Sequence, residues 1–172
     1  MEYMFLPLKR YAEFSGRSRR MEYWMFFLFQ FLVGLVLQVV MMMMVGGAAF
    51  SGRPSSVMAA GGLMMVIMGL YGIFALAMFI PNIAVGVRRL HDTNRTGWWL
   101  LAPLVPYLFT FVLFALAVGG RSGAVGILAM VCMIAALGLG ITVLVFMFLE
   151  GTKGPNQYGP DPKGQVDAQV FA

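Results

Sequence analysis

Charged side chains are scarce in this sequence of 172 residues. Only 11% of the residues are charged and 60% are hydrophobic, whereas soluble domains have about 25% charged residues. A soluble protein covers its apolar core with polar side chains, and 12 basic and 7 acidic residues are too few to form such a cover. The composition therefore excludes a water-soluble globular protein, a disordered chain and a coiled coil.

Cysteine and histidine are almost absent. Cys132 is the only cysteine, so no disulfide can form within the chain, and a disulfide-stapled secreted domain is excluded. His91 is the only histidine, and no HExxH spacing is present. These residues are too few to ligate a metal, and we expect neither a metal nor another cofactor.

Four long apolar stretches dominate the sequence, at residues 22–50, 57–87, 98–118 and 124–149. Each is long enough to cross a hydrocarbon core of about 30 Å, which needs roughly 20 helical residues. Backbone groups in lipid must be bonded within a segment or in a closed barrel, and these stretches lack the alternation of barrel strands. We therefore predict a single membrane domain, an all-α integral membrane protein with a four-helix transmembrane bundle.

Prolines mark two of the predicted spans. The span at residues 57–87 would measure about 46 Å as one straight helix, which exceeds the hydrocarbon core. Pro81 and Asn82 predict a break or kink in it. Pro103 and Pro106 predict a bend in the first turns of the third span.

Basic residues are distributed unevenly around the spans. Ten of the 12 lie in the N-terminal segment 1–21, the loop 88–97 and the tail 150–172, whereas the other two loops contain only Arg53 and Arg121. The positive-inside rule makes the more basic side cytoplasmic, so both termini are predicted to be cytoplasmic. Beside a bilayer, we expect such a basic rim to attract anionic membrane lipids and no nucleic acid.

The loop 88–97 has a density of polar groups that turn formation does not require. Its sequence is RRLHDTNRTG. Guanidinium groups bind phosphate oxygens bidentately, and an aspartate beside a histidine is a pairing used in general-base chemistry. The predicted anion contacts are Arg17, Arg20, Arg88, Arg89 and Arg95. The candidate catalytic pair is His91 and Asp92. The predicted internal polar network consists of Glu22, His91, Asp92, Asn94, Glu150, Asn156 and Tyr158.

Two carboxylates stand at predicted helix ends. Ser18 is a candidate N-cap of the first span, and Glu22 complements the positive helix terminus. Glu150 lies at the C-terminal end of the fourth span, where the helix dipole disfavours a negative charge, so we expect a cation opposite it. The candidate cations are Arg19, Arg88 and Arg89. The tail that follows Glu150 is rich in glycine and proline and is predicted to be a chain of turns.

Three motifs flank the spans, namely SGRxxRxEYW, RRLHDxNRxGWW and GxxGPNxYGPDP. Together they resemble the YhaH-like inner-membrane proteins of bacteria (DUF805), a family of unknown function, from about Tyr11 to Pro162. The matching positions are Arg17, Arg20, Glu22, Trp24, Arg89, Leu90, His91, Asp92, Gly97, Trp98, Trp99, Pro155, Asn156, Tyr158, Gly159 and Pro160. The resemblance implies a small multi-pass protein of the bacterial inner membrane, and it implies no activity, substrate or cofactor.

Three functional hypotheses follow. We favour a non-enzymatic module whose basic cytoplasmic rim binds anionic lipid headgroups or a protein partner. A membrane-embedded enzyme acting on a lipid or isoprenoid phosphate is the alternative, although enzymes of that kind commonly use several acids to hold Mg²⁺. An oligomeric transporter or channel component is a further alternative, because four spans without a charge in mid-membrane require a partner. The small-residue spacings Gly119-x-x-x-Gly123 and Ala136-x-x-x-Gly140 predict close helix packing, and less readily a homo-oligomer.

Overall fold

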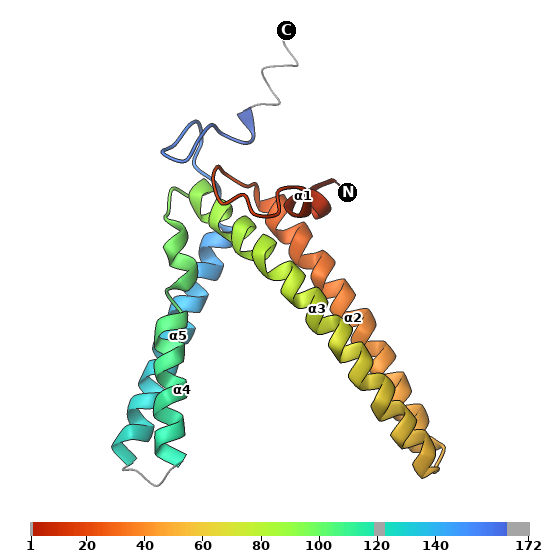
Figure 1. Cartoon of the computed structure of the whole chain (residues 1–172). Coiled ribbons are helices and arrows are strands. Elements are labelled where there is room, and N and C mark those ends of the chain that lie inside the picture. Colours follow the sequence, from red (N-terminus) through yellow and green to blue (C-terminus); the bar gives the residue numbers. More distant parts are fainter. Residues whose placement is uncertain (1, 119–122, 165–172) are drawn as a thin grey trace. The chain divides into compact units, whose positions relative to one another are not determined.

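The structure, a computed structural model, describes residues 2–118 and 123–164. Its elements in chain order are α1 (Glu2–Lys9), α2 (Arg20–Phe50), α3 (Pro54–Asp92), the 3-10 helix η1 (Gly97–Leu101), α4 (Leu104–Val118) and α5 (Gly123–Phe148) (Figure 1). Within the described residues, 4 helical segments are long and apolar enough to span a membrane: α2, α3, η1 with α4, and α5. The predicted all-α fold class, with four helices able to span a membrane, is confirmed. Arg121, Gly119 and the end of the predicted tail, residues 165–172, lie outside the described residues.

The chain divides into two compact units. Unit 1 comprises Met1–Glu13 and Trp24–Asn82, which include α1, most of α2 and most of α3. Unit 2 comprises Phe14–Tyr23 and Ile83–Ala172, which include the first turn of α2, the last turns of α3, η1, α4, α5 and the tail. The three motifs found in the sequence therefore belong almost entirely to unit 2.

Unit 1 is a hairpin in which α2 and α3 lie side by side (Figure 1). The turn between them passes through Gly52, whose φ of +63° lies in the left-handed region that glycine adopts at little cost. The side-chain amides of Gln30 on α2 and Asn82 on α3 exchange two hydrogen bonds of 2.8 Å. This pair satisfies both amides on otherwise apolar helices and ties the hairpin together.

α3 is helical through Pro81, where the sequence predicts a break or kink. Proline has no N–H, so the carbonyl of Ala77, four residues earlier, has no helical donor. The hydroxyl of Tyr11 donates a hydrogen bond of 2.6 Å to that carbonyl. The N-terminal segment thus replaces the missing helical bond, and the boundary between the two units falls directly after Asn82.

In unit 2, α4 packs against α5. The third span begins with η1 and becomes α-helical at Leu104, so its geometry changes at the prolines that predicted a bend. Gly97, the first residue of η1, lies so close to α3 that a Cβ on it would stand 2.8 Å from Cγ1 of Val87. Glycine at this position therefore lets the third span start directly against the end of α3.

Candidate functional site

Five charged side chains of unit 2 are almost completely buried. They are Arg17, Glu22, Arg88, Arg89 and Asp92, with 0% to 6% of each residue exposed. Burying a charge is costly unless the charge is paired and hydrogen-bonded. We call these residues the buried charge cluster, and the partners of each member decide what the site can do.

Asp92 is the centre of this cluster. Its carboxylate accepts hydrogen bonds from Nε of Arg17, at 3.0 Å, and from Nη1 of Arg89. Arg89 precedes Asp92 by one helical turn, so the end of α3 brings them together. Gly151 of the tail lies against the same carboxylate, because a Cβ there would stand 2.5 Å from Cγ of Asp92. Arg17, Asp92 and Arg89 thus form a closed charged triad with the tail packed on it.

The remaining guanidinium donors of Arg89 go to the C-terminal end of α5. Nε of Arg89 donates to the carbonyl of Met147 at 3.3 Å, and Nη2 donates to the carbonyl of Leu149. Nη1 of Arg20 donates to the neighbouring carbonyl of Phe148 at 3.2 Å. The last carbonyls of a helix lack intrahelical donors and carry a partial negative charge. These arginines therefore cap α5.

Glu22 and Arg88 form the second buried pair. Nη2 of Arg88 lies 3.1 Å from Oε1 of Glu22. The prediction that Ser18 caps α2 is wrong: α2 begins at Arg20, and the first N–H groups of the helix donate to the carbonyl of Arg19. Ser18 instead donates its backbone N–H to the carbonyl of Arg88 at 3.1 Å, which fixes the chain entering α2 against the end of α3.

The tail is a chain of turns, as predicted, and it is held against the end of α3. Nη1 of Arg17 donates to the carbonyl of Gly154 at 2.6 Å. The backbone N–H of Thr152 donates to the carbonyl of Asp92 at 2.8 Å, and the Asn156 amide donates to the carbonyl of His91 at 2.9 Å. Three motifs that are far apart in the sequence therefore meet at one place.

Asp161 closes the last turn of this tail. Its carboxylate accepts the backbone N–H of Lys163 at 2.9 Å and that of Gly154 at 3.0 Å. These hydrogen bonds stabilise the charged form and lower the pKa of Asp161 below its ordinary value, the bond from Lys163 having the largest effect.

His91 does not pair with Asp92, whose carboxylate is taken by arginines. Nδ1 of His91 lies 3.2 Å from the carbonyl of Gly16. A carbonyl only accepts, so Nδ1 carries the proton. The imidazole ring stacks on Tyr158, with the ring centroids 3.9 Å apart and the planes 3° from parallel. His91 and Asp92 therefore do not form the acid and base pair that was considered from the sequence.

The other predicted residues have different surroundings. Glu150 has a cationic partner, but the prediction of Arg19, Arg88 or Arg89 is wrong, since Nη2 of Arg20 lies 2.9 Å from Oε1 of Glu150. Asn94 has a positive φ of 58° and ends α3 in a Schellman motif, in which the N–H of Arg95 reaches back to Leu90. The guanidinium of Arg95 lies over the ring of Phe146, 3.8 Å from its centroid.

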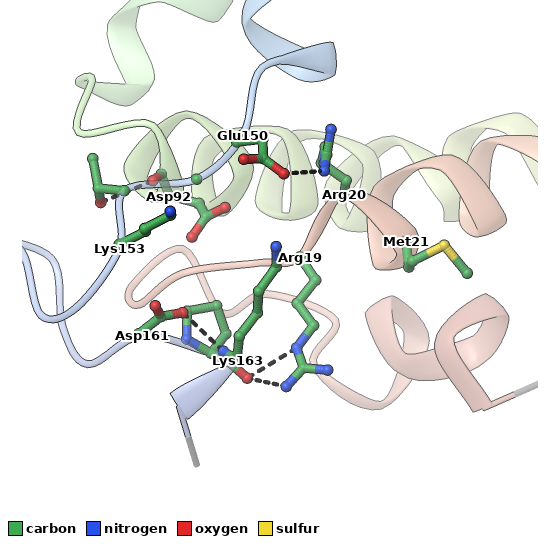
Figure 2. A pocket seen from close by; sticks show the side chains of 11 residues that line it. Arg19, Arg20, Met21, Asp92, Glu150, Lys153, Asp161 and Lys163 are labelled. Carbon is green, nitrogen blue, oxygen red and sulfur yellow. Dashed lines mark hydrogen bonds and ion pairs between the residues drawn. The ribbon is translucent and has the colours of Figure 1, made fainter. Parts of the chain in front are cut away.

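A polar pocket of about 270 Å³ lies beside the buried charge cluster (Figure 2). Its lining residues come from the start of α2, the end of α3 and the tail. They are Arg19, Arg20, Met21, Asp92, Glu150, Gly151, Thr152, Lys153, Asp161, Pro162 and Lys163. The sequence analysis named Arg19 only as a candidate partner of Glu150 and used Lys153 and Lys163 only to predict the orientation. The position of these three residues beside the motifs was the signal that could have indicated the pocket.

The acids in this pocket already have partners. Asp92 is paired with two arginines, Glu150 with Arg20, and Asp161 with two backbone N–H groups. Among the described residues, the ammonium group of Lys153 has no hydrogen-bond or ion-pair partner. Also within that part of the chain, no group of three or more His, Cys, Asp or Glu side chains is arranged to hold a metal ion.

The helices and this site define a class of protein: an all-α, four-span membrane protein with buried arginine–carboxylate pairs at a polar end. The chain belongs to the family described as "Protein of unknown function (DUF805)", whose model matches residues 11–160. It is 32% identical over 163 residues to Inner membrane protein YhaI of Escherichia coli (strain K12), which covers 95% of this chain and 97% of that relative. It is 31% identical over 167 residues to Inner membrane protein YhaH of the same organism, covering 95% and 98%. No solved structure matches.

Proposed function

We propose that this protein is a non-enzymatic inner-membrane module that binds a phosphate-bearing anion in the polar pocket. The observation that carries the proposal is the composition of the pocket lining. Four cations line the pocket, two at the start of α2 and two in the tail, and the three acids beside them already have partners. A phosphate group carries a negative charge and acceptor oxygens that cationic side chains bind, and the ammonium group of Lys153 has no other partner among the described residues.

Three of the five arginines that were predicted from the sequence to bind an anion are not part of this proposed site. Arg17, Arg88 and Arg89 are buried and donate to internal partners. Arg20 lines the pocket, and Arg19, Lys153 and Lys163 join it. The ligand is either the headgroup of an anionic lipid or a soluble phosphate compound, since both offer the same oxygens.

We further propose that the polar pocket and both termini are on the cytoplasmic side. The distribution of Lys and Arg in the sequence supports this orientation. Reporter fusions at each terminus test it: both should be active with a cytoplasmic reporter and inactive with a periplasmic one.

Binding to the purified full-length protein tests the pocket. The probes are inorganic phosphate and glycerol phosphate in solution, and vesicles with or without phosphatidylglycerol or cardiolipin. A lysine near an anionic surface contributes about 1 kcal/mol, so the variant K153Q/K163Q should weaken binding roughly 30-fold. The matched control is K9Q, which removes a lysine of α1 outside the pocket.

The outcomes separate the two sources of phosphate. Binding to anionic vesicles alone identifies a lipid headgroup, and binding of soluble phosphate identifies a soluble ligand. The proposal fails if none of the probes binds, or if K9Q weakens binding as much as K153Q/K163Q does.

A further inference from the structure

A second cavity in unit 2 has a different chemistry. Its volume is about 460 Å³, within the range of roughly 300–1,000 Å³ that is common for small-molecule sites. It lies between the last turns of α3 and η1. The lining residues are Phe14, Ile83, Val87, His91, Gly97, Trp98, Leu100 and Leu101. Apart from the imidazole and the indole this lining is apolar, and it includes no Arg, Lys, Asp or Glu.

His91, which lines this cavity, carries one ring nitrogen that can accept a hydrogen bond. Nδ1 holds its proton against the carbonyl of Gly16, and an imidazole is largely neutral at pH 7.5. Nε2 is therefore the unprotonated nitrogen. One face of the ring is covered by Tyr158, and no hydrogen-bond partner of Nε2 is found among the described residues.

The acceptor nitrogen of His91 and the apolar lining of the cavity together favour a neutral ligand that carries a hydrogen-bond donor. A phosphate or carboxylate finds no cation in this cavity, and an ammonium finds no anion. A neutral hydroxyl donates to Nε2 without bringing a charge into apolar surroundings. Trp98 is 76% exposed, as expected for a tryptophan at the membrane interface, which is the depth at which lipid hydroxyl groups lie.

We propose that this cavity binds the apolar chain of a long-chain alcohol, with the hydroxyl of the alcohol donating to Nε2 of His91. The site is distinct from the polar pocket, because the two linings share no residue. A test of alcohol binding in this cavity is therefore independent of phosphate binding in the polar pocket.

Quenching of Trp98 fluorescence tests this inference in the full-length protein. The variant W24F/W99F leaves Trp98 as the only tryptophan. The probes are a bromine-labelled long-chain alcohol and its methyl ether, which has the same chain and no hydroxyl donor. A net hydrogen bond is worth about 0.5–1.5 kcal/mol, so saturable quenching by the alcohol should occur at roughly threefold to tenfold lower concentration than quenching by the ether.

Two substitutions of the histidine isolate the acceptor. The amide of H91N can still donate to the carbonyl of Gly16, but it places nothing at Nε2, so the preference for the alcohol should disappear. H91Q reaches the Nε2 position with an acceptor oxygen and should retain the preference. I83F fills the cavity and should weaken quenching by both probes.

The controls decide between binding and simple partitioning. A chain with Trp24 as its only tryptophan should be quenched equally by alcohol and ether. The inference is overturned if the alcohol and the ether quench Trp98 equally, if H91N keeps the preference, or if I83F leaves both probes unaffected while circular dichroism shows intact helices.

Discussion

Replacing Asp92 by asparagine should strongly destabilise unit 2. The substitution keeps the size of the side chain and removes the charge that compensates Arg17 and Arg89, which are 6% and 0% exposed. Removing one partner of a buried ion pair costs about 3–5 kcal/mol, because the other charge stays buried without compensation. The free energy of unfolding is measured by titrating folded protein in mild detergent with sodium dodecyl sulfate and following tryptophan fluorescence.

The matched control is E150Q, the same carboxylate-to-amide change at an equally close pair. Arg20 and Glu150 lie 2.9 Å apart, as do Arg17 and Asp92, but their side chains are 40% and 65% exposed. Exposed pairs contribute about 0–1 kcal/mol. D92N should therefore cost at least about 2 kcal/mol more than E150Q. Equal costs for the two variants would refute the argument that burial makes Asp92 essential.

Three further predictions concern other contacts. Y11F should cost about 1 kcal/mol by leaving a carbonyl of α3 without a donor, and this cost should vanish in a P81A background, where the helical N–H returns. G151A should destabilise by about 1–3 kcal/mol in the same titration, because its Cβ overlaps the Asp92 carboxyl group. Backbone hydrogen bonds lower the pKa of Asp161, so its contribution is full above the ordinary aspartate pKa of about 3.9 and is lost as the pH falls through the lowered value. Hydrogen exchange of the tail should show this loss, and D161N should remove its pH dependence.

The four spans could be predicted because the signal for them is local. A run of apolar residues of sufficient length needs no knowledge of its neighbours to indicate a membrane helix. The ends of the spans depend on tertiary contacts, and the end of α3 was not predicted correctly from the sequence. The loop expected at residues 88–97 starts too early, since α3 continues to Asp92. Charged residues ordinarily end a span, but Arg88 and Arg89 find partners that keep them buried inside a helix.

Only part of the candidate site could be predicted from the sequence. Arg20, Asp92 and Glu150 were named, whereas Arg19, Lys153 and Lys163 were not named as anion contacts, and the pairing of the charges was not predicted. The motifs are dense in charge, and the structure brings Arg17, Arg89 and Asp92 together, with Arg88 beside Glu22. Which cation meets which acid depends on helical register and on long-range packing. Glu150 pairs with Arg20, the first residue of α2, whereas the neighbouring Arg19 donates to the carbonyl of Pro162 in the tail. Asp92 pairs with arginines and not with the adjacent His91, because adjacent residues on a helix face different directions.

The charge balance of the buried cluster explains why it contains so many arginines. Arg17, Arg88 and Arg89 carry three positive charges against the two negative charges of Glu22 and Asp92, which leaves a net charge of +1. The C-terminal end of α5 supplies a partial negative charge, and its carbonyls receive the spare donors of Arg89. The excess charge of the cluster is thus partly offset from within the protein, by about half a negative charge. Because Arg17, Arg88 and Arg89 are buried and donate to partners within the protein, the proposed anion binding is assigned to the cations of the polar pocket and not to these arginines.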